Sequence, residues 1–212
     1  GLNLHINKGE IFSVIGGNGT GKTTTTMLLS GILKPYRGKI KARGKIGFLP
    51  QDVQILFEQE SVMEELKKVD KSLIEKMNLQ KLLNMHPYDL SGGEMQRAAV
   101  GKLLLQRADI LLMDEPTKGL DAYLKQSLAE MLRKLADQKL SILMVTHDLE
   151  FAASYADRCG LLFDGQLISE DEPHGFFSGN RFYTTAAGLI AGDRIEKVIT
   201  CGEGIAACQN AE

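Results

Sequence analysis

The chain has 212 residues, of which 43% are hydrophobic and 25% are charged, and its formal net charge is -2. A chain of this length can bury one sizeable core, and the composition is that of an ordinary globular protein. The slightly acidic balance gives no general attraction to nucleic acid or to an anionic membrane surface. No apolar run reaches the roughly 18 residues that a bilayer crossing requires. Any membrane-spanning segment would therefore come from another chain.

The three cysteines form no CxxC pair, and their odd number favours unpaired thiols in a reducing compartment. The chain begins at Gly1, and Leu2, Leu4 and Ile6 already alternate with polar residues as they would in a strand. We therefore expect that further sequence precedes Gly1.

Short apolar runs alternate along the chain with longer segments of helical character. In chain order, the predicted strands cover residues 2–6, 11–15, a short stretch near 40, 46–49, 109–113, 141–146, 159–163 and 166–169. The predicted helical segments cover residues 22–31, 61–83 with breaks at Asn and Asp, a stretch after Gly93, and 121–136. Asp164-Gly165 separates the last two strands and is a strong hairpin signal.

Strands that alternate with helices predict an α/β fold with a mostly parallel sheet and right-handed crossovers. The hairpin around Asp164 adds an antiparallel β element. Residues 61–106 carry little strand character, so we expect them to form a helical lobe on the sheet. Residues 186–212 are expected to be a partly disordered tail, in which the glycine-rich residues 200–204 form no helix.

A glycine-rich segment lies between the predicted strand 11–15 and the helix that begins at Lys22, and it follows the P-loop pattern. Its residues are Gly16, Gly17, Asn18, Gly19, Thr20, Gly21, Lys22, Thr23 and Thr24. Glycines let successive backbone N–H groups point at phosphate oxygens, and the following helix adds the positive end of its dipole. Lys22 is expected to reach the β- and γ-phosphates, and Thr23 to bind Mg²⁺. The alternative is an ordinary glycine turn with a solvated lysine, which the strand–loop–helix context disfavours.

Two adjacent carboxylates, Asp114 and Glu115, end the apolar run 110–113. Ligands of open α/β sheets bind at strand tips. We therefore expect Asp114 to hold Mg²⁺ through water and Glu115 to act as general base on an attacking water. Taken alone, the pair fits a turn equally well, because Pro116 follows it.

The segment Ser91-Gly92-Gly93-Glu94 predicts a capped helix start, with Ser91 as the N-cap and Glu94 as its capping-box partner. The two glycines also leave bare N–H groups that an anion can approach. Because the P-loop already provides one phosphate site, this second one suggests contact with an ATP that another subunit holds.

In this order, the segments resemble the nucleotide-binding domain of ABC-type ATPases, over nearly all of the chain up to about Ser178. Residues 90–97 are similar to the signature segment of that family, which is its most specific motif. The resemblance implies that Gln51 contacts Mg²⁺ and senses a transport partner. It also implies that Asp121 lies in the segment that crosses between two subunits, and that His147 contacts the γ-phosphate. A lone histidine after an apolar strand is usually structural, and the order of the motifs favours the functional role here.

The resemblance implies a P-loop NTPase core of the ABC ATPase type over residues 1–185, with a helical subdomain at about 54–106. It implies that ATP and Mg²⁺ are bound and ATP is hydrolysed, with Lys22, Glu115 and His147 as catalytic residues. ATP would close two such domains around itself, and hydrolysis would let them open. The family usually stacks adenine on an aromatic residue before the P-loop. Phe12 lies inside a predicted strand, so we expect that aromatic residue upstream of Gly1.

Residues 52–66 resemble a surface that docks on a membrane subunit, and residues 115–121 and 176–187 resemble the second ATPase half of tandem energy-coupling-factor proteins. Those proteins energise the uptake of vitamins or transition-metal ions. The resemblance therefore implies a transmembrane transporter subunit and a second ABC ATPase domain, in the same chain or in a homodimer. It implies no nucleic-acid partner and a location at the cytoplasmic face of the cell membrane.

Two other classes stay open at this point. A soluble ABC ATPase that acts on nucleic acid or ribosomes usually carries long coiled-coil insertions or basic extensions, whereas the segment between Gln51 and Ser91 is short. A P-loop kinase or GTPase fits Lys22 and Asp114 but gives no role to the Ser91 segment.

Overall fold

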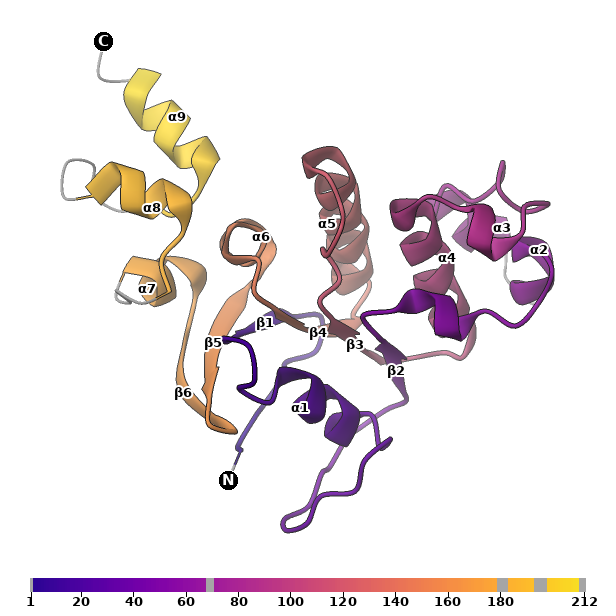
Figure 1. The fold of residues 1–212 in the computed structure, drawn as a ribbon, viewed down its shortest axis with the longest axis horizontal. Helices are drawn as coiled ribbons and strands as arrows, with labels where there is room; N and C mark the ends of the chain where they lie inside the picture. The colour runs from indigo at the N-terminus through magenta and orange to yellow at the C-terminus, as the bar shows by residue number, and fades with distance from the viewer. Residues whose placement is uncertain (1, 68–70, 179–182, 193–197, 210–212) are drawn as a thin grey trace.

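The computed structural model describes residues 2–67, 71–178, 183–192 and 198–209. Its centre is a six-stranded sheet in the order β2-β3-β4-β1-β5-β6 (Figure 1). The strands are β1 (Ile11–Ile15), β2 (Ile46–Leu49), β3 (Ile110–Asp114), β4 (Ser141–Thr146), β5 (Arg158–Phe163) and β6 (Gln166–Asp171). Strands β1 to β5 run parallel, and β6 pairs antiparallel with β5. This is the mostly parallel sheet with an antiparallel element that the sequence predicts.

Helices cover both faces of the sheet, which is why its central strands are apolar. Every residue of β1 and β4 is buried. Helix α1 (Lys22–Leu29) lies on one face, whereas α5 (Ala122–Asp137) and α6 (Leu149–Tyr155) lie on the other (Figure 1). One side of α5, including Leu128, Leu132 and Leu135, packs into the main hydrophobic core with residues of β1, β3 and β4.

A helical lobe stands beside β2 and β3, at the right of Figure 1. It contains η1 (Val53–Leu56), α2 (Val62–Glu65), α3 (Lys71–Lys76), η2 (Pro87–Asp89) and α4 (Gly92–Leu105). The described part of the helical stretch predicted at 61–83 contains two short helices, α2 and α3, and a predicted break, Asn78, follows α3. Ser61 starts α2 by accepting a hydrogen bond from the Glu64 N–H at 3.3 Å, and Asn78 adopts a φ of 52° after α3.

The buried carboxylate of Glu65 connects several parts of this lobe through hydrogen bonds. Glu65 accepts hydrogen bonds from the N–H groups of Glu58 and Gln59 and from the ammonium group of Lys102 on α4. Lys102 also donates to the carbonyl of Leu56 at 2.6 Å. The loop after η1 is therefore fixed to both α2 and α4.

The end of the chain contains α7 (Pro173–Ser178), α8 (Ala186–Ala191) and α9 (Cys201–Gln209), at the upper left of Figure 1. The expectation that residues 200–204 form no helix is wrong, because α9 includes most of them. Its start is capped: Glu203 accepts from the N–H groups of Ile199 and Thr200 at 2.9 and 3.0 Å, and Thr200 Oγ1 accepts from the Glu203 N–H at 3.2 Å. Caps and burial of Ile199 outweigh the low helix propensity of glycine here.

Two predicted strands are absent from the described sheet, at residues 2–6 and near residue 40. A strand is stabilised by a neighbour that pairs with its backbone, and no described segment pairs with either stretch. Leu2, Leu4 and Ile6 still pack against the core on the α1 side of the sheet. Among the described residues, no helix combines the length and apolar character that a membrane crossing needs.

Candidate active site

Three separate segments meet at one edge of the sheet because β3, β4 and β1 are parallel neighbours whose carboxyl ends lie together. Ile15 of β1 is level with Thr146 of β4, and Asp114 of β3 is level with Val145 of β4. The glycine-rich loop, the carboxylate pair and the histidine each lie at one of these strand ends. The sheet topology therefore brings together three groups of functional residues that are far apart in the sequence.

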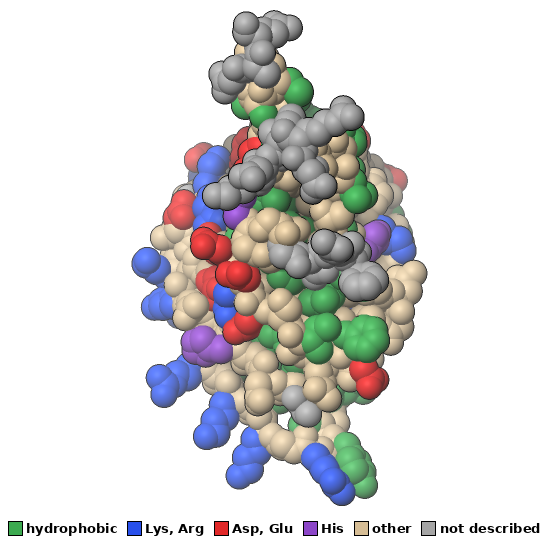
Figure 2. Space-filling model, turned by 90° about the vertical axis from the view of Figure 1, so that its left-hand side faces the viewer, with side chains coloured by type: hydrophobic (Ala, Val, Ile, Leu, Met, Phe, Trp, Pro, Cys, Tyr) green, Lys and Arg blue, Asp and Glu red, His purple; other side chains and the backbone are tan. Residues whose placement is uncertain are grey.

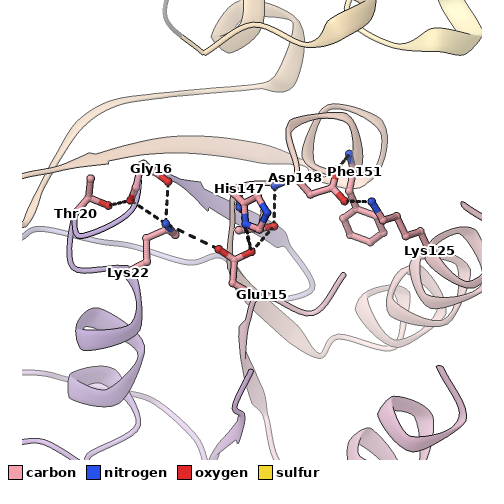
Figure 3. Close-up of polar contacts among 10 residues, drawn as sticks. Gly16, Thr20, Lys22, Glu115, Lys125, His147, Asp148 and Phe151 are labelled. Atoms are coloured by element: carbon pink, nitrogen blue, oxygen red, sulfur yellow. Dashed lines mark hydrogen bonds and ion pairs between the residues drawn. The ribbon is translucent and has the colours of Figure 1, made fainter. Parts of the chain in front are cut away.

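The glycine-rich loop folds around the ammonium group of Lys22. This side chain is 8% exposed, and its Nζ donates to the carbonyls of Gly16 at 2.8 Å and Gly17 at 3.0 Å (Figure 3). Gly19 and Gly21 have φ values of 80° and 94°, which side chains rarely adopt, so the tight turn depends on glycine. The loop leads directly into α1 and has the shape of a phosphate cradle.

The other residues of the loop include one that stabilises the turn and several that face solvent. Thr20 Oγ1 donates to the Gly17 carbonyl at 2.9 Å and stabilises the turn. The exposed members of the loop are Asn18, Gly19, Thr23 and Thr24. A phosphate group can therefore reach these backbone and hydroxyl groups from solvent.

Glu115 is the centre of the hydrogen-bond network in Figure 3. Its Oε2 lies 2.8 Å from His147 Nδ1 and accepts from the His147 N–H and from Thr146 Oγ1, each at 3.2 Å. Its Oε1 lies 3.9 Å from Lys22 Nζ. The residue has a φ of 50°, and its N–H donates to the Val145 carbonyl at 2.9 Å. A left-handed backbone costs energy at any residue other than glycine, and here it accompanies a carboxylate that lies toward both Lys22 and His147.

Asp114 lies just inside this network and is almost completely buried. Its exposed fraction is 2%, and its Oδ1 has no hydrogen-bond partner. Burial raises the pKa of Asp114, and the charge of Glu115 raises it further, whereas the Thr23 hydroxyl and Lys22 oppose the rise. A buried carboxylate oxygen without a partner beside a threonine hydroxyl has the chemistry of a site for a hard cation.

The predicted second anion-binding segment is a capped helix start, as the sequence indicates. The N–H and the hydroxyl of Ser91 both donate to Glu94 Oε2, at 2.9 and 2.7 Å. These two hydrogen bonds hold the pKa of Glu94 below its usual value. Ser91 and Gly92 are exposed, whereas Gly93 is buried.

The start of α4 packs against the segment that follows the carboxylate pair. A Cβ added to Gly93 would lie 2.7 Å from Leu124 Cδ2, so glycine permits the close approach of α4 and α5. The side-chain amide of Gln96 donates to the carbonyl of Pro116. Helix α4 lies well apart from the glycine-rich loop before α1 (Figure 1). The structure therefore does not bring Ser91, Gly92 and Gly93 to the phosphate cradle of their own chain.

Two further predicted residues lie around the edge of the site. Gln51 is exposed and follows β2, the strand next to β3. Asp121 caps α5, because its carboxylate accepts from the Leu124 N–H at 2.8 Å. Neither has a described hydrogen bond to Glu115 or Lys22, so their predicted roles depend on groups that this chain does not contain.

Sequence reasoning missed the residues that hold His147 in place. Asp148 caps α6 by accepting from the Phe151 N–H at 3.1 Å, and Lys125 of α5 donates to the other carboxylate oxygen of Asp148 (Figure 3). Thr146 Oγ1, besides donating to Glu115, accepts from the Asp148 N–H at 3.0 Å. The sequence feature that could have indicated this role is Asp148 itself, because Asp is a preferred N-cap residue and α6 begins directly after it.

The chain is similar to known proteins in both its sequence and its structure. Residues 1–118 match the family model described as ABC transporter. A protein of Bacillus thuringiensis subsp. konkukian, described as an ABC transporter ATP-binding protein, is 38% identical over 234 residues, which cover 99% of this chain and 42% of the relative. A Bacillus subtilis protein described as an HMP/thiamine import ATP-binding protein is 30% identical over 200 residues, which cover 84% of this chain and 37% of the relative.

The chain thus spans less than half the length of these two relatives. Among solved structures, cbiO1 from Clostridium perfringens, described as part of the ABC transporter complex cbiONQ, has a TM-score of 0.76 and 25% sequence identity. The match covers 84% of this chain and 83% of that structure.

Proposed function

The chain belongs to the ABC transporter family, as one of its ATP-binding domains, and from this premise we propose that it binds and hydrolyses ATP to energise a membrane importer. The observation that carries the proposal is the convergence of Lys22, Glu115 and His147 at one sheet edge. Each group follows a different strand of the sheet, and each has the charge or hydrogen-bonding capacity that phosphoryl transfer requires.

The proposed reaction is transfer of the γ-phosphoryl group of ATP to water. The Lys22 ammonium group neutralises charge on the β- and γ-phosphates, and the loop N–H groups bind their oxygens. Glu115 accepts a proton from the water whose oxygen attacks the γ-phosphorus, while the bond from that phosphorus to the β–γ bridging oxygen breaks. The products are ADP and inorganic phosphate. His147, held against Glu115 at 2.8 Å, orients the water and contacts the γ-phosphate.

The residues beside the loop fit a Mg²⁺ ion. Asp114 has the buried carboxylate oxygen without a partner, and the Thr23 hydroxyl lies against that carboxylate. Gln51 is the third proposed ligand. A bound Mg²⁺ would supply positive charge for the phosphate oxygens.

We propose that two ATP-binding domains close around ATP. Ser91, Gly92 and Gly93 form a helix start that lies away from the phosphate loop of its own chain, so they are free to contact a nucleotide held by a second domain. ATP favours the closed pair because it contacts both domains, and loss of the γ-phosphate weakens that link. The second domain is either a copy of this chain or a homologous half of a longer protein.

The descriptions of two similar proteins support the assignment to an importer. One relative is described as a thiamine import protein, and cbiO1 as part of a transporter complex. We propose the energy-coupling-factor type, in which a transmembrane subunit contacts residues 52–66 at the cytoplasmic face of the membrane. Within that surface, Ile55 and Met63 are large hydrophobic side chains that stay exposed in the isolated chain. The resemblance to the second ATPase half of a tandem energy-coupling-factor protein rests partly on residues 176–187, of which 179–182 lie outside the described residues.

The test is phosphate release from Mg-ATP by the purified full-length protein. Lys22→Met should remove both nucleotide binding and phosphate release, because the loop then lacks its cation. Lys34→Met, at an exposed lysine, is the matched control and should behave as wild type. Equal phosphate release by wild type and Lys22→Met would contradict the proposal. Loss of vitamin or metal-ion uptake on deletion of the gene would test the importer assignment.

A further inference from the structure

The tail of the chain has no role in the function proposed above, yet it contacts both the glycine-rich loop and helix α6, which follows His147. Tyr183 follows α7 and is half-buried, and its ring packs against a hydrophobic cluster that includes Ile15, Phe176, Phe177 and Ile199. Ile15 is the last residue before the glycine-rich loop. The same cluster contains Ala152 and Ala153 of α6. The tail therefore packs against the strand that enters the phosphate loop and the helix that follows His147.

The hydroxyl group of Tyr183 lies beside the phosphate loop. A Cβ built on Gly17 would lie 3.5 Å from the Tyr183 hydroxyl oxygen, so this hydroxyl is the nearest neighbour on that side of Gly17. The carbonyl of Gly17 accepts hydrogen bonds from both Lys22 Nζ and Thr20 Oγ1. Tyr183 thus adjoins the peptide unit around which the loop is organised.

A second contact connects the tail to the start of α6. Glu150, in the first turn of α6, accepts a hydrogen bond from the Ala187 N–H of α8 at 3.2 Å. Thr185 is 1% exposed and caps α8 by accepting from the Gly188 N–H at 3.0 Å. Tyr183 and Ala187 are therefore held in a fixed relation by the start of α8.

The far end of the tail is anchored as well. His174 Nε2 on α7 lies 2.9 Å from Glu203 Oε1 on α9, and the other carboxylate oxygen of Glu203 holds the backbone at Ile199. Val198 packs with Ala187 and Ala191 of α8. We define the tail latch as the described residues 183–192 and 198–209.

We propose that Tyr183 is a positioning residue for the phosphate loop, and that the tail latch couples this loop to the helix after His147. Tyr183 limits outward movement of the loop at Gly17, and Glu150 fixes the latch to α6. Since a loop that is already in its binding shape loses less entropy when a nucleotide binds, the latch raises nucleotide affinity. This inference rests on the proposed function, because it assumes that the loop binds nucleotide.

The test compares Tyr183→Phe and Tyr183→Ala with Tyr36→Phe and Tyr36→Ala, because Tyr36 is 95% exposed. The readouts are the Kd of a fluorescent ADP analogue, which does not need domain closure, and the thermal midpoint without nucleotide. Tyr183→Phe should weaken ADP binding by about threefold, and Tyr183→Ala by about tenfold. The thermal midpoint of Tyr183→Phe should stay at the wild-type value, and the Tyr36 variants should bind ADP as wild type does.

Hydrogen exchange gives a readout that a purely structural tyrosine would not affect. Coupling between two sites is reciprocal, so saturation with ADP should slow exchange of the Ala187 and Gly188 N–H groups in wild type. In Tyr183→Phe this slowing should shrink by about the same threefold factor. Unchanged ADP affinity in Tyr183→Phe and Tyr183→Ala, or no effect of ADP on these two amides, would overturn the inference.

The two possible failures are distinguishable through Lys22→Met. If wild type binds ADP, Lys22→Met does not, and the Tyr183 variants bind as wild type, only the role of Tyr183 is wrong. If wild type itself does not bind ADP, both the proposed function and this inference are overturned.

Discussion

The ammonium group of Lys125 donates a hydrogen bond to the carboxylate of Asp148, which directly follows His147 (Figure 3). Burial opposes ionisation of Asp148, but the hydrogen bonds from Lys125 and from the Phe151 N–H outweigh it and hold the pKa of Asp148 below its usual value. Lys125 lies one turn into α5, the helix that Asp121 caps. Asp148, the neighbour of His147, is therefore linked to the helix that begins after Asp121, the residue for which the resemblance implies a place between two subunits.

Lys125→Met should lower the rate of ATP hydrolysis without changing nucleotide affinity. The variant leaves Asp148 partly buried without its cation, so the loop that carries His147 loses its fixed position. We expect kcat to fall by about three- to tenfold, the effect of losing one charge-assisted hydrogen bond. Steady-state phosphate release and ADP titration measure the two quantities. Lys134→Met, at an exposed lysine on the same helix, is the control. A similar fall in kcat in Lys134→Met would mean that loss of any positive charge on α5 has this effect, and not loss of the contact with Asp148.

Glu115→Gln should keep ATP binding and nearly abolish turnover. The amide preserves the size of the side chain but cannot accept the proton of the attacking water. The expected loss in kcat is about 10²–10⁴-fold, and ATP should then trap the closed pair of domains. Phosphate release and size-exclusion chromatography with ATP test both effects. Glu130→Gln, at an exposed position of α5, is the control. Wild-type turnover in Glu115→Gln would remove Glu115 from its role as base.

Ser91→Arg should block closure of the domain pair. Ser91 is exposed and is the N-cap of α4, a helix that lies apart from α1 and the glycine-rich loop before it (Figure 1), so we expect a bulky cation there to leave monomer binding of ADP intact. ATP-dependent dimerisation of the Glu115→Gln protein should disappear when Ser91→Arg is added, as measured by light scattering. Parallel loss of ADP binding by the monomer would show that Ser91 acts within its own chain.

Lys102→Met should destabilise the helical lobe in a pH-dependent way. Burial opposes ionisation of Glu65, but hydrogen bonds from Lys102 and from two backbone N–H groups outweigh it and hold the pKa of Glu65 below its ordinary 4.5. The stability from this carboxylate is therefore fully present above pH 4.5 and is lost as the pH falls through the folded-state pKa.

At pH 7 we expect Lys102→Met to lower the free energy of unfolding by about 2 kcal/mol, less than for a fully buried pair because Lys102 is partly exposed. Urea unfolding at several pH values measures the difference from wild type. That difference should shrink as the pH is lowered below 4.5. A difference that stays constant with pH would mean that Lys102 contributes by packing alone.

Much of the fold was predictable because the strands are bounded by strong local signals. Residues 142–145 are apolar and lie between Ser141 and Thr146, and β4 has the predicted bounds 141–146. Helix α9 was not predictable, because its stability comes from a capping carboxylate and from burial of Ile199 against α7. The low helix propensity of Gly202 and Gly204 instead predicts that this segment forms no helix.

The grouping of Lys22, Glu115 and His147 follows from the order of motifs, because parallel strands present their carboxyl ends at one edge. The left-handed backbone of Glu115 and the contact between Lys125 and Asp148 did not follow. The first accompanies the contacts of Glu115 with the end of β4, and the second depends on how α5 packs beside the start of α6. A single sequence carries little information about such distant pairs.

Strand β4 lies between β1 and β3 although it is synthesised after both. While a ribosome is still translating this chain, β1 and β3 have no partner between them, and their apolar faces have no complete sheet to join. Pairing over such long sequence separations is slow, and it leaves strands open to aggregation in the meantime. A nascent chain released before residue 146 would consequently lack the strand that places the glycine-rich loop and Glu115 side by side.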